Sequence, residues 1–139
     1  SLILSMKNNE RVKKFGEVFT PKELVNEVLD KLSQDLFKNP LKTYLDPSCG
    51  DGAFLVEVLE RKLNNGIDYE QALSTIYGVD ILEDNVELCR KRLLGKNRHL
   101  EHIVEKNIVC ADALRYHYRF DGSDPYKTAK DIQFDRLFG

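Results

Sequence analysis

The sequence lacks the features that mark membrane-spanning, secreted or zinc-binding proteins. None of its apolar runs approaches the roughly 20 residues that a helix needs to cross a bilayer, so we expect no membrane partner. The three cysteines, Cys49, Cys89 and Cys110, include no C-x-x-C pair, and the three histidines have no paired cysteine or carboxylate motif. We therefore expect no metal site. An odd number of cysteines without a secretory signal indicates a cytoplasmic protein with free thiols.

The sequence also has no excess of positive charge. Its net charge is −2 and its pI is about 5.9, so any contact with nucleic acid requires a local basic patch or residues outside these 139. The hydrophobic content of 42% over 139 residues predicts one compact domain with a core. We divide that domain into an N-terminal arm with a capped helix, residues 1–40, and an α/β core, residues 41–139.

Residues 44–54 form the stretch around which the rest of the chain is arranged. An apolar strand end leads into a loop with Gly50 and Gly52, and a helical pattern follows. The loop lacks the Lys-Ser/Thr ending of a P-loop and the third glycine of a dinucleotide fingerprint, which disfavours pyrophosphate. Asp46 and Asp51 favour a cationic ligand, such as an ammonium or a sulfonium. The alternative is a glycine-rich turn without a ligand.

The residues before this stretch predict an arm followed by a helix. The basic residues between positions 6 and 14 are typical of a solvated arm rather than a DNA clamp. Thr20 is the expected N-cap, with Pro21 at the first helical position and Glu23 completing a capping box. Apolar residues at three- and four-residue spacing extend the predicted helix over residues 21–37.

The residues after residue 40 predict an open α/β sheet. Strands are expected over residues 41–46, 76–80, 107–110 and 132–138, with helices over 53–63, 68–75 and 82–94 between the first three. This pattern gives about four mainly parallel strands with flanking helices. The basic run of residues 90–98 is expected to stabilise a helix end rather than to bind phosphate. Residues 115–130 are expected to form a loop.

Acidic residues follow two of the predicted strands. Asp80 ends the second strand, where a carboxylate can accept hydrogen bonds from ribose hydroxyls; alternatively it caps the following helix. Asp112 follows the third strand and could accept an adenine amino group, because a carboxylate rejects purines that lack this donor. Its alternative is a simple turn or helix start with Ala113.

Four stretches together resemble a known family in the order in which that family uses them. The central nine residues, Asp46-Pro47-Ser48-Cys49-Gly50-Asp51-Gly52-Ala53-Phe54, resemble the S-adenosylmethionine-binding motif of DNA adenine-N6 methyltransferases whose cofactor motifs precede the catalytic motif. The other three are Phe15-Gly16-Glu17-Val18-Phe19-Thr20-Pro21, Gly78-Val79-Asp80-Ile81 and, less closely, Ala111-Asp112-Ala113-Leu114.

The resemblance implies a Rossmann-like methyltransferase fold with S-adenosylmethionine as the cofactor. It places the methionine part against residues 19–21 and the ribose on Asp80, with the adenine between Ile81 and the Asp112 turn. The family often has an aromatic residue where this chain has Ala113. The implied cofactor-binding residues are Phe19, Thr20, Pro21, Asp46, Pro47, Ser48, Cys49, Gly50, Asp80, Ile81, Asp112 and Ala113.

The activity implied by the resemblance is direct transfer of a methyl group to N6 of adenine in DNA, within a restriction-modification system. The family's catalytic loop would follow Gly139, so we assign no catalytic residue and expect this chain alone, truncated before that loop, to be inactive. Double-stranded DNA would then bind mostly through regions beyond this chain, and the exposed sheet edge, that of the predicted fourth strand, could self-associate. The alternatives are methyl transfer to RNA or protein, or a module that only binds the cofactor.

Overall fold

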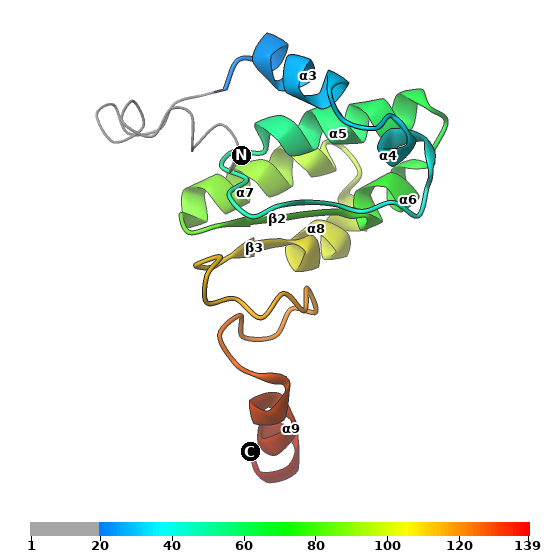
Figure 1. The fold of residues 1–139 in the computed structure, drawn as a ribbon. Helices are drawn as coiled ribbons and strands as arrows, with labels where there is room; N and C mark the ends of the chain where they lie inside the picture. Colours follow the sequence, from blue (N-terminus) through cyan, green and yellow to red (C-terminus); the bar gives the residue numbers. More distant parts are fainter. Residues whose placement is uncertain (1–19) are drawn as a thin grey trace, which may run out of the picture.

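A three-stranded parallel sheet forms the centre of the chain (Figure 1). In this computed structural model, which describes residues 20–139, the strands are β1 (Tyr44–Asp46), β2 (Ile76–Asp80) and β3 (Ile108–Cys110), in the order β1-β2-β3. Asp46 pairs with Gly78, and Asp80 pairs with Cys110. The carboxyl ends of all three strands therefore lie at the same edge of the sheet, where ligands of open α/β sheets bind.

Helices connect the strands and cover one face of the sheet. The first crossover contains α5 (Ala53–Asn64) and α6 (Tyr69–Ser74), and the second contains α7 (Glu83–Leu94), η1 (Arg98–Leu100) and α8 (Glu101–Asn107). These helices and α3 (Lys22–Asp30) bury the larger hydrophobic cluster, which includes Ile76 and Ile108 from the sheet. No helix within residues 20–139 is long and apolar enough to span a membrane.

The opposite face of the sheet is covered by a loop. Because side chains alternate along a strand, Val79 and Val109 point away from the helical layer. They pack with Ala111, Tyr116 and Phe120 from residues 111–128, a segment that contains no regular element and that we call the aromatic loop. The sequence predicts this loop at the right place but assigns it no packing role.

The predicted capped helix over residues 21–37 is wrong in two respects. Helix α3 begins at Lys22 with Pro21 as its N-cap, and no side chain caps it, so the predicted bond from Thr20 is absent. The helix also ends at Asp30, and a separate short helix, α4 (Asp35–Lys38), follows. Gln34 Nε2 donates to the carbonyl oxygens of Leu29 (3.3 Å) and Leu32 (2.9 Å), which stabilises the break.

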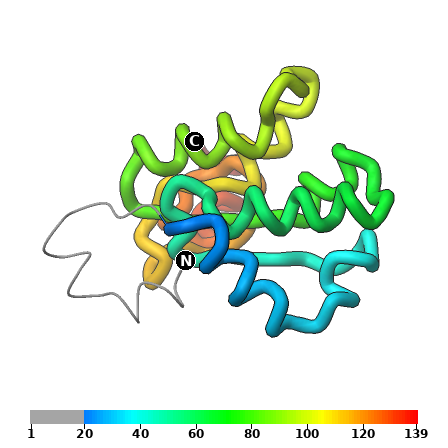
Figure 2. Tube along the Cα trace, turned by 90° about the horizontal axis from the view of Figure 1, so that it is seen from above, coloured from blue at the N-terminus to red at the C-terminus, as the bar shows by residue number. Residues whose placement is uncertain are grey.

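The predicted fourth strand is also wrong, because this segment forms helix α9 (Ala129–Phe138). Thr128 and Asp131 make a reciprocal capping box, and the rings of Phe134 and Phe138, one helical turn apart, lie 4.9 Å apart. Figure 1 and the view from above in Figure 2 both place α9 on the side of the sheet opposite α3 and α5. A strand here would need hydrogen bonds to a neighbouring strand, whereas the contacts that stabilise the helix lie within the segment itself.

Candidate functional site

The loop between β1 and α5 is held against β2 by backbone hydrogen bonds. Cys49 N donates to the carbonyl oxygen of Val79 at 2.9 Å, and Gly52 N donates to that of Cys49 at 2.9 Å. At the end of β1, the carboxylate of Asp46 is buried, and its Oδ1 accepts the amide hydrogen of Ser48 at 3.0 Å. The loop therefore has a fixed position at the carboxyl edge of the sheet.

The two glycines of this loop have different physical roles. Gly52 has φ +92°, and a Cβ at this position would lie 2.8 Å from Cys89 Sγ, so the glycine lets the start of α5 approach α7. Gly50 has φ +54°, but apart from the adjacent residues no atom of the described part of the chain would lie within 4 Å of a Cβ there. Among residues 20–139 the space in front of Gly50 is therefore open, although the adjacent Cys49 is buried.

Asp80 connects the end of β2 to the glycine loop. Its Oδ2 accepts the amide hydrogen of Gly50 at 3.0 Å. Its Oδ1 accepts from Leu82 N at 2.9 Å and from Asn85 Nδ2 at 3.2 Å, at the start of α7. The carboxylate thus has a structural role. Its bonds to Leu82 and Asn85 agree in part with the alternative in which Asp80 caps the following helix, and its bond from Gly50 is a contact that the sequence does not predict. The adjacent Ile81 side chain is 66% exposed, which leaves an apolar surface beside this carboxylate.

The turn at Asp112 lies next to Asp80 across the sheet. Ala111 N donates to the carbonyl oxygen of Asp80 at 2.9 Å, and Cys110 Sγ lies 3.5 Å from the carbonyl oxygen of Ile81. Asp112 Oδ1 accepts from Leu114 N at 3.0 Å. This bond agrees with the turn alternative and fixes one carboxylate oxygen toward the backbone.

The charges around the loop are partly paired. Asp51 Oδ2 lies 3.0 Å from Arg92 Nη1, so this carboxylate is less available to a cationic ligand than the sequence suggests. Burial, with a smaller contribution from the charge of Asp46, raises the pKa of Tyr44 to about 12. A hydrogen bond with Cys89, followed by burial, raises the pKa of the Cys49 thiol, which keeps that thiol protonated. Both thiols act as packing groups beneath the loop.

The structure brings most of the predicted site residues together. Residues 46–50, 80–81 and 112–113 lie at the carboxyl ends of the three strands, at one edge of the sheet. Hydrogen bonds to Asp80 come from Gly50 in the loop and from Ala111 directly after β3. Thr20 and Pro21 precede α3, which packs against α5, the helix that follows the loop; Lys22 Nζ of α3 lies 3.8 Å from Glu57 Oε1 on the second turn of α5. Phe19 lies outside the described residues.

The sequence does not identify two tyrosines that contact this site. Tyr126 and Tyr118, both in the aromatic loop, make hydrogen bonds with the backbone of Asp112 and Ala113. The spacing of the aromatic residues in this segment is the only local signal, and it does not identify their partners. Within residues 20–139, no group of three or more histidine, cysteine or acidic side chains could hold a metal ion.

Comparison with known proteins identifies a family and a relative. The family model described as N-6 DNA Methylase matches residues 1–129. The type II methyltransferase M.VspI of Vibrio sp. (strain 343) is 34% identical over 121 residues, which make up 87% of this chain and 25% of that protein. The chain therefore spans about a quarter of the length of this relative.

Proposed function

The chain belongs to the N-6 DNA methylase family, and on that premise we propose that it binds S-adenosylmethionine at the carboxyl edge of its sheet. We further propose that it is the cofactor-binding part of a methyltransferase that acts on N6 of adenine in DNA. Membership of a methyltransferase family implies a methyl donor. The assignment of S-adenosylmethionine as that donor rests on the residues that surround Gly50.

The open space in front of Gly50 carries the cofactor proposal. It lies at the carboxyl ends of β1 and β2, and within residues 20–139 no atom other than those of the adjacent residues lies within 4 Å of a Cβ built at this position. The bare backbone allows a ligand to approach closely, which a side chain would prevent. The buried carboxylate of Asp46 lies at the end of β1, so a positively charged ligand is favoured over a phosphate. These features fit a sulfonium compound.

We assign the remaining contacts by the chemistry of each group. Asp80 would accept ribose hydroxyls while retaining its bond from Gly50 N, because each carboxylate oxygen can accept more than one hydrogen bond. Exposed Ile81 would pack on one face of the adenine, and Asp112 would accept its amino group. When bound, the cofactor supplies an electrophilic methyl group; the residues of this chain hold and orient it.

The binding proposal is tested by replacing each of two glycines with alanine, one at the site and one away from it. Gly50→Ala should cost about 1–2 kcal/mol of folding stability, since Gly50 has φ +54°, and it should lower calorimetric affinity for S-adenosylhomocysteine at least about 10-fold by filling the open space. Gly66→Ala is the matched control. Gly66 also has positive φ (+85°), and a Cβ there would likewise have none of the non-adjacent described atoms within 4 Å, but it follows the far end of α5.

Two results would overturn the binding proposal. The first is that the folded wild-type chain shows no measurable calorimetric binding of S-adenosylmethionine or of S-adenosylhomocysteine. The second is an equal loss of affinity in Gly50→Ala and Gly66→Ala, which would assign the effect to stability instead of to the site. Urea denaturation of both variants gives the stability comparison.

The substrate proposal is supported by the family and by the type II methyltransferase relative, whose name also favours a role in restriction-modification. A radiolabelled-methyl assay on duplex DNA, RNA and protein tests the substrate proposal. It compares the 139-residue chain with a longer protein that contains this chain and has about the length of the relative. We expect label on DNA adenine from the longer protein and none from the chain alone, because no described residue is assigned as catalytic. Label on RNA or protein alone would replace the DNA assignment.

The predicted fourth strand, whose edge the sequence suggested for self-association, is helix α9, so that edge does not exist. We propose instead that the edge of β1 allows self-association. Within the described residues, β1 pairs only with β2, and Leu45 in β1 is 44% exposed. A strand with an unpaired edge can pair with another chain. Light scattering should then show a mass that increases with concentration, whereas a constant monomer mass would contradict this proposal.

A further inference from the structure

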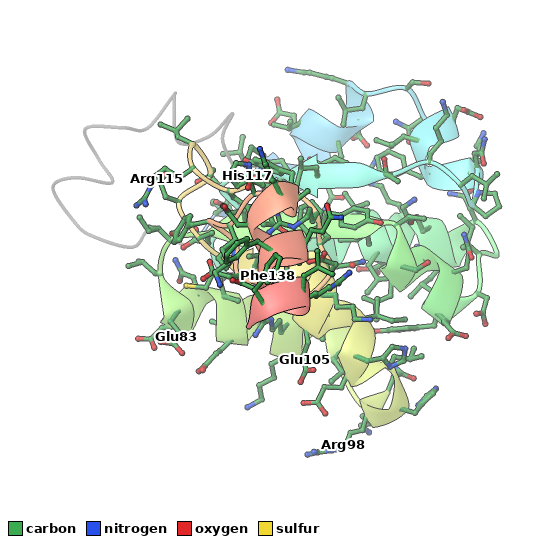
Figure 3. All side chains as sticks on the ribbon, turned by 90° about the horizontal axis from the view of Figure 1, so that it is seen from below. Glu83, Arg98, Glu105, Arg115, His117 and Phe138 are labelled. Atoms are coloured by element: carbon green, nitrogen blue, oxygen red, sulfur yellow. The ribbon has the colours of Figure 1, made fainter. Side chains whose placement is uncertain are left out.

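The aromatic loop contacts the site from the side of the sheet opposite the helices. Ring pairs link Tyr77 on β2 to Phe120 (4.7 Å), and Tyr116 to both Tyr118 (4.8 Å) and Phe120 (5.3 Å). Figure 3 looks onto this loop and α9 from below, with Arg115 labelled. The loop is therefore anchored on the sheet, although it contains no regular secondary structure.

Two hydroxyls of this loop contact consecutive residues of the Asp112 turn. Tyr126 Oη accepts the amide hydrogen of Asp112 at 2.9 Å. Tyr118 Oη donates to the carbonyl oxygen of Ala113 at 2.7 Å. One bond holds an N–H group and the other holds a C=O group, so together they fix the orientation of the peptide units on both sides of the turn.

Each tyrosine is itself held in place. The guanidinium of Arg115 lies over the ring of Tyr126, 4.5 Å from its centroid. Tyr118 has φ +53°, a left-handed conformation that residues other than glycine seldom adopt. Such a conformation persists only where surrounding contacts hold it, and it often occurs at functional sites. Burial, followed by the charge of Asp112, raises the pKa of the Tyr118 phenol, which keeps it protonated as a donor.

We propose that Tyr118 and Tyr126 are positioning residues that orient the Asp112 turn and thereby set selectivity for adenine in the cofactor. This inference rests on the proposed function and extends it to base selectivity. Adenine presents an amino donor at its C6 position, whereas hypoxanthine presents a carbonyl oxygen there, which a carboxylate repels. Because hydrogen bonds weaken steeply with distance and angle, this discrimination depends on where the turn holds the carboxylate.

Removal of single hydroxyls tests the proposal. Tyr118→Phe and Tyr126→Phe each keep the ring and lose one hydrogen bond. We expect each to lower calorimetric affinity for S-adenosylhomocysteine about 3- to 10-fold and to leave affinity for its inosine analogue unchanged, so that the ratio of the two affinities falls. In Tyr126→Phe the amide hydrogen of Asp112 should also exchange faster with solvent, as measured by NMR.

Tyr69→Phe is the matched control. Its hydroxyl also donates to a backbone carbonyl oxygen, that of Leu93 at 2.5 Å, but at the end of α7. We expect this variant to lose stability while the affinity ratio stays at the wild-type value. An equal loss of affinity for both ligands in the loop variants, or no change for either, would overturn the positioning role. Failure of the wild-type chain to bind both S-adenosylhomocysteine and S-adenosylmethionine would overturn both this inference and the proposed function.

Discussion

Asp80 connects three segments of the chain, two through its carboxylate and one through its backbone. Its oxygens accept hydrogen bonds from Gly50 in the glycine loop and from Leu82 and Asn85 at the start of α7. The backbone of the same residue accepts from Ala111 after β3. A change at Asp80 therefore alters the shape of the site as well as any direct contact with a ligand.

We expect Asp80→Ala to weaken binding of S-adenosylhomocysteine by about 1–3 kcal/mol, the usual effect of removing a hydrogen bond to a charged group. Urea denaturation should show a separate loss of stability of similar size, because Gly50 N loses its acceptor. Asn85→Ala is the control, since it removes only one donor to Asp80 and no proposed ligand contact. Calorimetry that shows equal affinity for wild type and a folded Asp80→Ala protein would remove Asp80 from the site.

At the level of elements, the first and last described helices differ in how they are stabilised. Helix α3 buries Val25 and Leu29 completely, and Arg61 of α5 contacts both Asn26 and Asp30 at its surface. Helix α9 buries no residue. An isolated helix of this length is marginal in water, so its stability depends on the local capping box.

We therefore expect Thr128→Ala to weaken α9 without changing global unfolding. Loss of such a cap costs a helix about 1 kcal/mol, which should increase amide hydrogen exchange within Ala129–Phe138. The midpoint of urea unfolding should stay unchanged. Leu29→Ala provides the contrast, because truncation of a fully buried leucine costs about 2–5 kcal/mol. A lower unfolding midpoint in Thr128→Ala would mean that α9 contributes to the global fold.

At the level of the whole molecule, ionisable groups buried by the fold make stability depend on alkaline pH. Burial and the nearby Asp46 raise the pKa of Tyr44 to about 12 in the folded state, compared with 10.0 ordinarily. Below pH 10 the phenol is protonated in both states, and its contribution to stability is complete. Between pH 10 and 12 the unfolded state loses the proton first, so the free energy of unfolding falls as pH rises.

The expected result is a steeper alkaline loss of stability in wild type than in Tyr44→Phe, measured by urea denaturation at several pH values from about 9 to about 12. Some loss should remain in the variant, because burial also raises the pKa of Tyr69 and Tyr116. Lys62 acts in the opposite direction, since burial lowers its pKa and its unfavourable charge disappears at high pH. Identical pH profiles for wild type and Tyr44→Phe would show that burial of this phenol has no effect on stability.

The sequence by itself determined the elements whose signals are local. Helical periodicity placed α5 and α7 to within a residue or two, and the apolar run placed β2 at its observed bounds, Ile76–Asp80. The loop glycines and the acidic residues after the strands also indicated the edge of the sheet at which the candidate site lies. These features depend on neighbours within a few residues, whose spacing along the chain is visible in the sequence.

Only the tertiary structure decided the contacts between distant residues. Gly50 and Asp80 are 30 positions apart, and Asp112 and Tyr126 are 14 apart, so no local pattern pairs them. The segment that became α9 is a different case. Its alternation predicts a strand, but a strand needs a neighbouring strand to pair with, and here a capping box and a pair of rings within the segment stabilise a helix instead. Contacts across the fold decide the pairing of distant residues, such as Gly50 with Asp80, which the spacing along the chain does not show.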